Sequence, residues 1–213
     1  MKPLKTELQD AETLRDLGSA SVQIVHDLKN QLNGLKLYAT FLRKRLEKAE
    51  RPADEQETIV KLISGLERAA ADMNVLVRFG RALDLRRQPG TDLTRLVADS
   101  ADGTRFETDG GTYEGDFDPA LLAEALKSIT AGARGETAGG EASVRLSGDG
   151  SGAVVEWVGA AAAAAAEGED PFRSLAGATG LRMALAARIV RAHGGEVSHE
   201  GGRIRARLPL QGR

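Results

Sequence analysis

The 213-residue sequence contains no cysteine, which excludes disulfide bonds, thiolate chemistry and cysteine-based metal sites. Neither charge dominates: 29 Lys and Arg stand against 31 Asp and Glu, for a net charge of −2. This balance gives no reason to expect binding to nucleic acid or to a membrane surface. No apolar run approaches the roughly eighteen residues of a membrane-spanning helix, and residues 1–7 lack the apolar core of a signal peptide. We therefore expect a soluble, cytoplasmic protein.

The length leaves room for two domains of different kinds. Residues 1–85 carry long helical patterns, and residues 90–213 alternate between short strand patterns and helix patterns. The charged segment 84–90, which ends in Pro89-Gly90, is typical of a linker. We predict an α+β protein, with an N-terminal antiparallel helical hairpin followed by an α/β sandwich.

Two stretches near the N-terminus carry apolar residues at alternating spacings of four and three, a period typical of helices packed in a bundle. Pro52 separates the two stretches, so they should form an antiparallel hairpin. One hairpin has too little partner surface to bury both apolar seams. We therefore predict a homodimer in which two hairpins form a four-helix bundle; the alternative is that the hairpin packs only on the rest of its own chain. The seam residues are Leu28, Leu32, Leu35, Ala39, Leu42 and Leu46, then Ile59, Leu62, Leu66, Ala69, Met73 and Leu76.

A histidine followed by an acid, with an asparagine four residues on, lies early in the first helix, as His26-Asp27 and Asn30. The heptad pattern places His26 on the face away from the seam. An exposed imidazole nitrogen is what phosphoryl transfer to histidine requires, so His26 is the candidate nucleophile. The stripe that contains it consists of His26, Asn30, Asn33 and Leu37.

A second, cationic stripe lies beside the first and consists of Lys29, Lys36 and Arg43. These side chains have two interpretations: they contact an acidic partner, or they pair with acids across the bundle. The asparagines of the first stripe have a second interpretation, as ordinary surface residues. Leu37 is the better contact candidate, because nothing in the hairpin explains an apolar residue on that face.

The second half of the chain is predicted to form one mixed sheet with helices on one face. Asp118 should cap a helix that has Pro119 at its first position. The alanine run at residues 160–166 is compatible with a helix or a loose loop, and the pattern does not decide between them. His193 precedes Gly194-Gly195 and is interpreted as a helix C-terminal residue favoured by the helix dipole. The predicted helices are 92–98, one from residue 119, and 180–192; the predicted strands are 104–107, 112–116, 142–146, 153–158, 196–200 and 203–208.

Four segments match, in order, the H box, N box, F box and last glycine box of a known family: residues 26–32, residues 118–133, Asp170-Pro171-Phe172 and residues 179–195. Through them the chain resembles the catalytic core of a two-component histidine kinase. Such a core joins a dimerisation and histidine-phosphotransfer hairpin to a GHKL-type ATP-binding domain. In type, the chain is most similar to single-chain histidine phosphotransferases derived from histidine kinases. The resemblance implies the GHKL fold for residues 90–213 and phosphotransfer for residues 1–85.

The sequence departs from the family at the positions that would hold ATP. The N box of the family places asparagines that hold Mg²⁺ against the triphosphate, whereas Ser128 and Gly132 stand there in this chain. The aspartate that reads adenine in the family is replaced by Gly159 and the alanines after it. In the last glycine box, Ala178 and Arg182 take two glycine positions. We therefore expect that ATP binding is lost and that the protein holds no cofactor or metal of its own.

The H box is intact, and the resemblance implies roles for its residues. His26 would carry the phosphoryl group, and Asp27 would orient the imidazole and assist removal of its proton. Asn30 would position a water that dephosphorylates a partner. The implied partner is a response-regulator receiver domain, which carries its own aspartate and Mg²⁺. The residues expected to contact it are Lys29, Asn33, Lys36 and Leu37.

The leading hypothesis is a histidine phosphotransferase that shuttles phosphate through His26 between receiver aspartates without ATP. One alternative is a divergent histidine kinase that phosphorylates itself from ATP. Another is a pseudokinase adaptor that binds a response regulator without chemistry. A receiver phosphatase that depends on Asn30 lies between the two.

Overall fold

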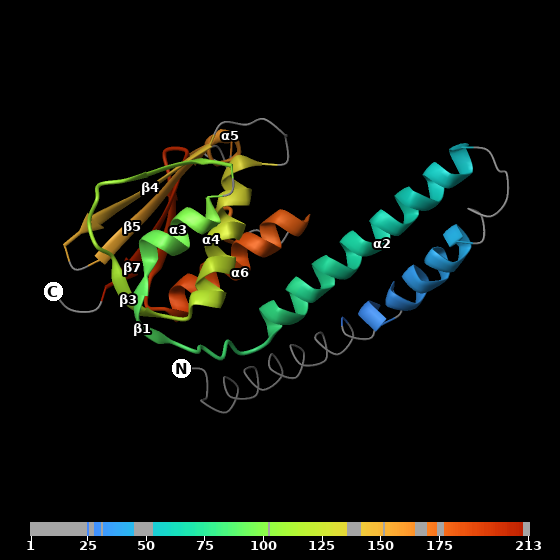
Figure 1. Ribbon diagram of the computed structural model, residues 1–213, viewed down its shortest axis with the longest axis horizontal. Helices are drawn as coiled ribbons and strands as arrows, with labels where there is room; N and C mark the ends of the chain where they lie inside the picture. The colour runs from blue at the N-terminus through green and yellow to red at the C-terminus, as the bar shows by residue number, and fades with distance from the viewer. Residues whose placement is uncertain are drawn as a thin grey trace, which may run out of the picture. The chain divides into compact units, whose positions relative to one another are not determined.

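The structure is a computed structural model that describes residues 25, 28–30, 32–44, 53–101, 103–135, 142–150, 152–164, 170–173 and 177–210. The chain divides into two compact units, Met1–Ala82 and Leu83–Arg213, called unit 1 and unit 2 below. Unit 1 is helical, and unit 2 combines a sheet with helices (Figure 1).

Two antiparallel helices form the described part of unit 1. Residues 28–30 and 32–44 are helical, and helix α2 covers Ala53–Gly80 (Figure 1). Lys36 Nζ lies 2.9 Å from Glu67 Oε1 on the facing helix, and Ala39 and Ile63 are buried nearby. The predicted helical hairpin is therefore confirmed. No helix in the described part of the chain is long and apolar enough to cross a membrane.

Five leucines of the predicted seam remain exposed within the single chain, at 38% to 53% of their surface. The ion pair between Lys36 and Glu67 shows that residue 36 lies opposite residue 67 in the antiparallel hairpin. In that register Leu28 lies at about the level of Leu76, and Leu42 at about the level of Leu62, whereas Leu35 has no exposed leucine opposite it. Unit 1 thus presents an uncovered apolar face formed by Leu28, Leu35, Leu42, Leu62 and Leu76.

A five-stranded mixed sheet forms the centre of unit 2, with strand order β2-β4-β5-β7-β6 (Figure 1). Strands β2 and β4 are parallel, and every other neighbouring pair is antiparallel. The strands are β2 (Arg105–Thr108), β4 (Ala142–Asp149), β5 (Gly152–Gly159), β6 (Glu196–Glu200) and β7 (Arg203–Pro209).

Helices α3 (Leu93–Ser100), α4 (Pro119–Arg134) and α6 (Gly177–Ala192) cover one face of this sheet (Figure 1). Asp118 caps α4 as predicted: its Oδ1 accepts the backbone N–H groups of Ala120 and Leu121 at 3.1 and 3.0 Å. The core between the layers includes Leu93, Val97, Leu122, Leu126, Ile129, Val144, Leu146, Val155, Trp157, Ile189, Ile204 and Leu208.

Alternation along the strands explains why the sequence pattern could be interpreted. In β4, Val144 and Leu146 are buried against the helices, whereas Arg145 between them is exposed on the other face. Strand β7 repeats the pattern with three buried apolar residues and exposed arginines. The predicted α/β sandwich, with helices on one face of the sheet, is confirmed.

The prediction of a single sheet was wrong. The assignment of residues 88–90 to the linker was wrong as well. Residues 88–90, assigned to the linker, belong to strand β1 (Gln88–Asp92), which pairs antiparallel with β3 (Glu114–Phe117) in a separate two-stranded sheet. Pro89 cannot donate a backbone hydrogen bond, and the register is irregular between Gln88 and Thr91. Local sequence therefore indicates a break, and only pairing with β3 makes this segment a strand.

The alanine run begins as a helix, α5 (Ala160–Ala164), directly after β5. Ala162 is 1% exposed, and its carbonyl oxygen lies 2.9 Å from Nε2 of His199 on β6. Gly202, in the turn between β6 and β7, lies close to Ala163: a Cβ added to Gly202 would be 3.1 Å from the Cα of Ala163. The helical propensity of alanine alone did not decide between a helix and a loop. In the structure the run is helical and packs against the β6–β7 hairpin.

Candidate functional site

The outward face of the first helix carries three of the predicted stripe residues in the described part of the chain. Asn30, Asn33 and Leu37 are all exposed, and Leu37 leaves 55% of its surface uncovered. His26 and Asp27 lie outside the described residues. The described stripe thus faces away from α2, as the heptad pattern predicts.

The two predicted partner-binding lysines belong to the second stripe, and they are less exposed than the residues of the first. Lys29 and Lys36 are both half-buried. Lys36 forms the 2.9 Å ion pair with Glu67, so its charge is paired across the hairpin. Surface pairs of this kind contribute little to stability, about 0 to 1 kcal/mol. A role for either lysine in partner binding stays a prediction.

Two aromatic residues extend the apolar surface around Leu37. Tyr38 is 68% exposed and Phe41 is 61% exposed. They follow Leu37 by one and four residues, so all three side chains lie on neighbouring parts of one helix face. Sequence reasoning selected Leu37 and missed the other two, although their spacing carried the signal. Exposed aromatic clusters of this kind mark interaction surfaces.

The second candidate region lies in unit 2, where the family resemblance places ATP. At Gly132 on α4, a Cβ would lie 2.4 Å from Met183 Sδ on α6. Met183 is 2% exposed, so its side chain fills the space between the two helices. Glycine offers no side chain to a metal. Any larger residue at position 132 would have to displace the side chain of Met183.

The end of β5 is equally closed. A Cβ at Gly159 would lie 2.4 Å from the backbone oxygen of Ala133 on α4 and 3.3 Å from Cβ of Ala142. At Gly135, which has φ of +80°, a Cβ would lie 2.9 Å from Cβ of Ala161 in α5. The backbones of α4, β5 and α5 are thus in direct contact here. With this backbone, no side chain fits at position 159.

Polar contacts nearby serve structure. Trp157 Nε1 donates a hydrogen bond to Thr130 Oγ1 at 2.9 Å in the buried layer between β5 and α4. Phe172 of the F-box segment is 4% exposed, and its N–H donates to Asp170 Oδ1 at 3.0 Å. Arg182 is exposed on α6. The side chain of Ala178, another predicted departure, lies outside the described residues.

A network of hydrogen bonds around the buried His193 joins residues 86–87, at the start of unit 2, to the ends of two helices. Besides its two capping bonds, Asp118 accepts the N–H of Arg86 at Oδ2, at 2.8 Å. The guanidinium of Arg87 donates to the carbonyl of Ala192, at the end of α6, at 2.9 Å. His193 is 1% exposed, and its Nε2 accepts the N–H of Asp118 at 3.0 Å. The start of α4, the end of α6 and residues 86–87 are therefore fastened together.

The two bonded nitrogens define the charge state of His193. Nε2 faces an N–H donor and must be unprotonated, whereas Nδ1 lies 2.8 Å from the carbonyl of Ile189 and carries the hydrogen. Burial lowers the pKa of His193, and the charge of Arg87 acts in the same direction. The carbonyl of Ile189 and the acids Asp118 and Asp116 oppose the shift. His193 directly follows the last residue of α6, as predicted, but the helix dipole is not what favours it there, because burial and the Asp118 N–H keep it neutral.

Unit 2 is expected to lose stability as the pH falls below the ordinary pKa of histidine, 6.5. The unfolded chain then binds a proton that folded His193 resists, so the free energy of unfolding drops until the pH passes below the folded pKa. Fluorescence of Trp157, the one tryptophan of the chain, reports urea unfolding of this unit between about pH 8 and about pH 5.

His193→Gln should remove this slope, and the matched control His199→Gln should retain it. A slope of unchanged size in His193→Gln would assign the pH dependence to other groups.

Nothing in the described residues resembles a metal centre. No group of three or more His, Asp or Glu side chains is placed to hold a metal ion in the part of the chain that the structure covers. Asp118, the acid nearest His193, uses its carboxylate oxygens on backbone N–H groups.

No protein-family model and no curated protein matches the sequence. Solved structures do match. The full-length protein ShkA in complex with AMPPNP is 19% identical, with a TM-score of 0.64, and the match covers 88% of this chain and 44% of that one. The histidine kinase ThkA in complex with the response regulator TrrA is 14% identical, with a TM-score of 0.62, covering 97% of this chain and 66% of that one.

These likenesses define the fold: a helical hairpin followed by a sheet covered on one face is the architecture of a histidine kinase catalytic core. At 14% and 19% identity they support the fold and carry no activity to this chain. The chain spans under half the length of ShkA and about two thirds of ThkA.

Proposed function

We propose that this chain is a histidine phosphotransferase of a two-component phosphorelay. His26 accepts a phosphoryl group from the aspartate of one receiver domain and passes it to the aspartate of another. The observation that carries the proposal is the contrast between the two candidate regions. The helix face that follows His26 is open and apolar, whereas two described positions where the family resemblance places ATP-binding groups, Gly132 and Gly159, lie directly against other atoms of the protein.

The chemistry needs few groups from this chain. An imidazole nitrogen of His26 attacks the phosphorus of an aspartyl phosphate; the P–N bond forms as the P–O bond breaks, and the aspartate leaves as a carboxylate. Asp27 orients the ring and takes up its proton. The second receiver reverses the step, with its aspartate as nucleophile. Mg²⁺ is supplied by the receiver, so the phosphotransferase needs none.

The face below His26 suits a protein partner. Leu37, Tyr38 and Phe41 are between 55% and 68% exposed and lie about three to four helical turns beyond His26 in sequence. These side chains bury little surface within the hairpin, so covering them with a partner removes apolar surface from water and stabilises the complex. Asn30 and Asn33 lie between this patch and His26, where a docked receiver would meet them.

ATP does not enter the proposed reaction. Mg-ATP requires metal ligands on α4 and an acid at the end of β5, and the residues present do not fit these tasks. Gly132 lies under Met183, and a side chain at Gly159 would collide with the backbone of α4. We infer that the nucleotide-binding capacity of this fold has been replaced by internal packing.

Phosphate exchange tests the proposal. A panel of receiver domains, each phosphorylated beforehand with labelled phosphate and freed of reagents, is incubated with the chain, without ATP and then with Mg-ATP. Acid-labile, alkali-stable label on the chain, passed on to a second receiver, is the expected result. Labelling only from Mg-ATP would establish a divergent kinase. Absence of label from every source, with the receivers' phosphate unchanged, would leave the adaptor.

We further propose that the chain is a homodimer through the apolar face of unit 1. Five exposed leucines of the seam lie on two antiparallel helices, with Leu28 at about the level of Leu76 and Leu42 at about the level of Leu62, and a second hairpin can cover such a face in a four-helix bundle. Full burial of a leucine side chain in the dimer interface stabilises the association by about 1.5 to 3 kcal/mol. Several such residues from each copy make a stable association plausible on physical grounds.

Leu35→Glu combined with Leu42→Glu should convert the dimer to a monomer. Two like charges per chain would then be buried at the centre of the bundle, which is unfavourable without partners. Sedimentation of the variant and of the matched control Val60→Glu, also on an exposed apolar residue of unit 1 outside the seam, measures the effect. A wild-type chain that sediments as a monomer at high concentration would contradict the dimer.

A further inference from the structure

The face of the sheet opposite the helices carries a ladder of arginines and acids. Strand register places Glu107, Arg145, Glu156 and Arg205 side by side across β2, β4, β5 and β7, so that the charges alternate. Arg145 Nη2 lies 2.9 Å from Glu107 Oε2, and Arg205 Nε lies 2.7 Å from Glu156 Oε2. Arg203, Arg205 and Arg207 follow one another at alternate positions of β7. No described helix of unit 2 covers this face.

Two of the acids, Glu107 and Glu156, are less exposed than the arginines that they contact. The side chain of Glu156 is 16% exposed beneath Arg203 and Arg205, which leave 52% and 47% of their side chains uncovered. Burial raises the pKa of Glu156, but hydrogen bonds and charge from the two arginines outweigh it and lower the pKa. Hydrogen bonds and charge from their arginines lower the pKa of Glu107 as well as that of Glu156, so these two carboxylates are ionised anchors beneath the more exposed guanidinium groups.

Arg205 and Arg207 keep most of their donors available. A guanidinium has five N–H groups, and the carboxylate contacts use only one edge: Nε of Arg205 on Glu156, and Nε of Arg207 on Asp149 at 3.1 Å. Held by that edge, the side chains have already lost rotamer freedom, so binding an anion costs less entropy. Guanidinium groups pair well with carboxylates because the two planar groups match.

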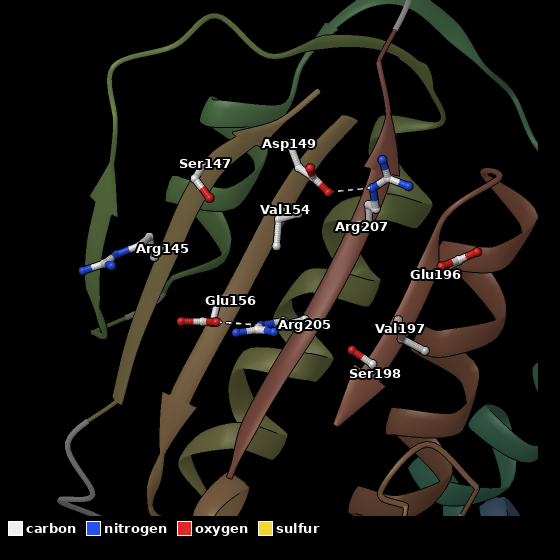
Figure 2. Close-up of a pocket in the computed structure, with 10 residues that line it drawn as sticks. All are labelled: Arg145, Ser147, Asp149, Val154, Glu156, Glu196, Val197, Ser198, Arg205 and Arg207. Carbon is white, nitrogen blue, oxygen red and sulfur yellow. Dashed lines mark hydrogen bonds and ion pairs between the residues drawn. The ribbon is translucent and has the colours of Figure 1, made fainter. Parts of the chain in front are cut away.

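Arg145, Arg205 and Arg207 line a shallow hollow of about 500 Å³ together with Asp149 and Glu156 (Figure 2). Short side chains line it too: Val154 lies between Arg145 and Arg207, Ser147 lies on β4, and Ser198 lies on β6 beside Arg205 (Figure 2). Five arginines and three acids occupy β2, β4, β5 and β7 on this face, whereas the edge strand β6 adds Glu196 and Glu200. The charge is thus separated, positive over the middle of the sheet and negative along β6.

We propose that this face binds an acidic, extended segment of a partner protein that runs along β7. Alternate residues of a strand lie about 6.6 Å apart, so acids at every second position of an extended segment match Arg203, Arg205 and Arg207. The width and openness of the face suit a polypeptide. Glu196 and Glu200 repel a carboxylate from β6 and so keep the segment over the centre of the sheet. The site is independent of phosphotransfer through His26.

Fluorescence anisotropy with the full chain tests this assignment. The probe is a labelled peptide of about twelve residues that alternates Glu and Thr, with an alternating Gln and Thr peptide as the neutral reference, in about 50 mM NaCl. The Glu peptide should bind, and the neutral peptide should not. Added salt should weaken the binding, because the contacts are exposed charges.

Arg205→Gln with Arg207→Gln should raise the dissociation constant at least about tenfold. Glu156 keeps Arg203 in this variant, and Asp149 is 59% exposed, so both acids stay paired or hydrated and the fold should persist. The single change Arg207→Gln, with a smaller loss, serves if the double variant fails to fold. The matched control, Arg95→Gln with Arg191→Gln, removes the same charge from exposed positions on α3 and α6.

Equal binding of the two peptides would overturn the proposal, as would an equal loss in the control. A DNA duplex that binds this face more than tenfold tighter than the Glu peptide would also overturn it, in favour of a phosphate polymer.

Discussion

Replacing His26 with alanine is expected to abolish phosphate transfer between receiver domains, lowering the rate by on the order of a thousandfold or more. Transfer through this chain needs a nitrogen that forms a covalent bond to phosphorus, and a methyl group has none. Each receiver retains its own aspartate and Mg²⁺, so the phosphate should be lost to water only as fast as from the isolated receiver. The measurement is the rate at which label appears on the second receiver.

Two neighbouring substitutions separate the possible roles of this face. Asn30→Ala should leave transfer through His26 in place, but it should slow hydrolysis if Asn30 positions a water. Asn74→Ala is the matched control, being an exposed asparagine on α2 to which no role is assigned. Persistent transfer in His26→Ala would refute the relay. Unchanged partner binding together with unchanged signalling in that variant would instead support an adaptor.

Gly159→Asp, which restores an acid where the family carries one, is expected to destabilise unit 2 and to give no ATP binding. Any Cβ at this position would lie 2.4 Å from the backbone oxygen of Ala133, which cannot move aside as the end of a flexible side chain can. Overpacking of this kind costs about 1 to 3 kcal/mol. The carboxylate adds the cost of a buried charge without a partner. We expect a loss of about 3 kcal/mol or more.

Urea unfolding followed by Trp157 fluorescence measures the loss in unit 2 alone, because no other tryptophan exists in the chain. Gly159→Ala isolates the steric part and should fall between the wild type and Gly159→Asp. Val158→Thr, at the adjacent exposed position of β5, should change stability by less than about 0.5 kcal/mol. An unchanged midpoint for Gly159→Asp, with Mg-ATP now bound, would show that the closed packing is no barrier to nucleotide.

The helices and most strands of this protein could be predicted because their patterns are periodic and local. Each of three local patterns indicates its structure within a few residues. They are the heptad spacing of the hairpin, the alternation along β4 and β7, and the helix start at Asp118-Pro119. The outward position of Asn30, Asn33 and Leu37 followed from the same periodicity. Tyr38 and Phe41 could have been found in the same way.

The candidate site in unit 2 was only half predictable. The missing metal ligand at Gly132 and the missing acid at Gly159 are visible in the sequence as absences. That Met183 fills the first position, and that a backbone carbonyl closes the second, depends on which residues of α4, α6 and β5 meet in space. A glycine in a sequence does not tell whether open space or another atom lies beside it.

By itself, the sequence determined the two kinds of architecture, the exposed stripe of the first helix and the loss of the acid and amide side chains that the family uses for ATP. These are properties of spacing and residue type, which act locally. Tertiary structure alone decided that residues 88–92 pair with β3, that the alanine run becomes α5, and that His193 is buried and neutral. In each case the deciding partner lies far away in the sequence, and contact free energy between distant segments overrides weak local preference.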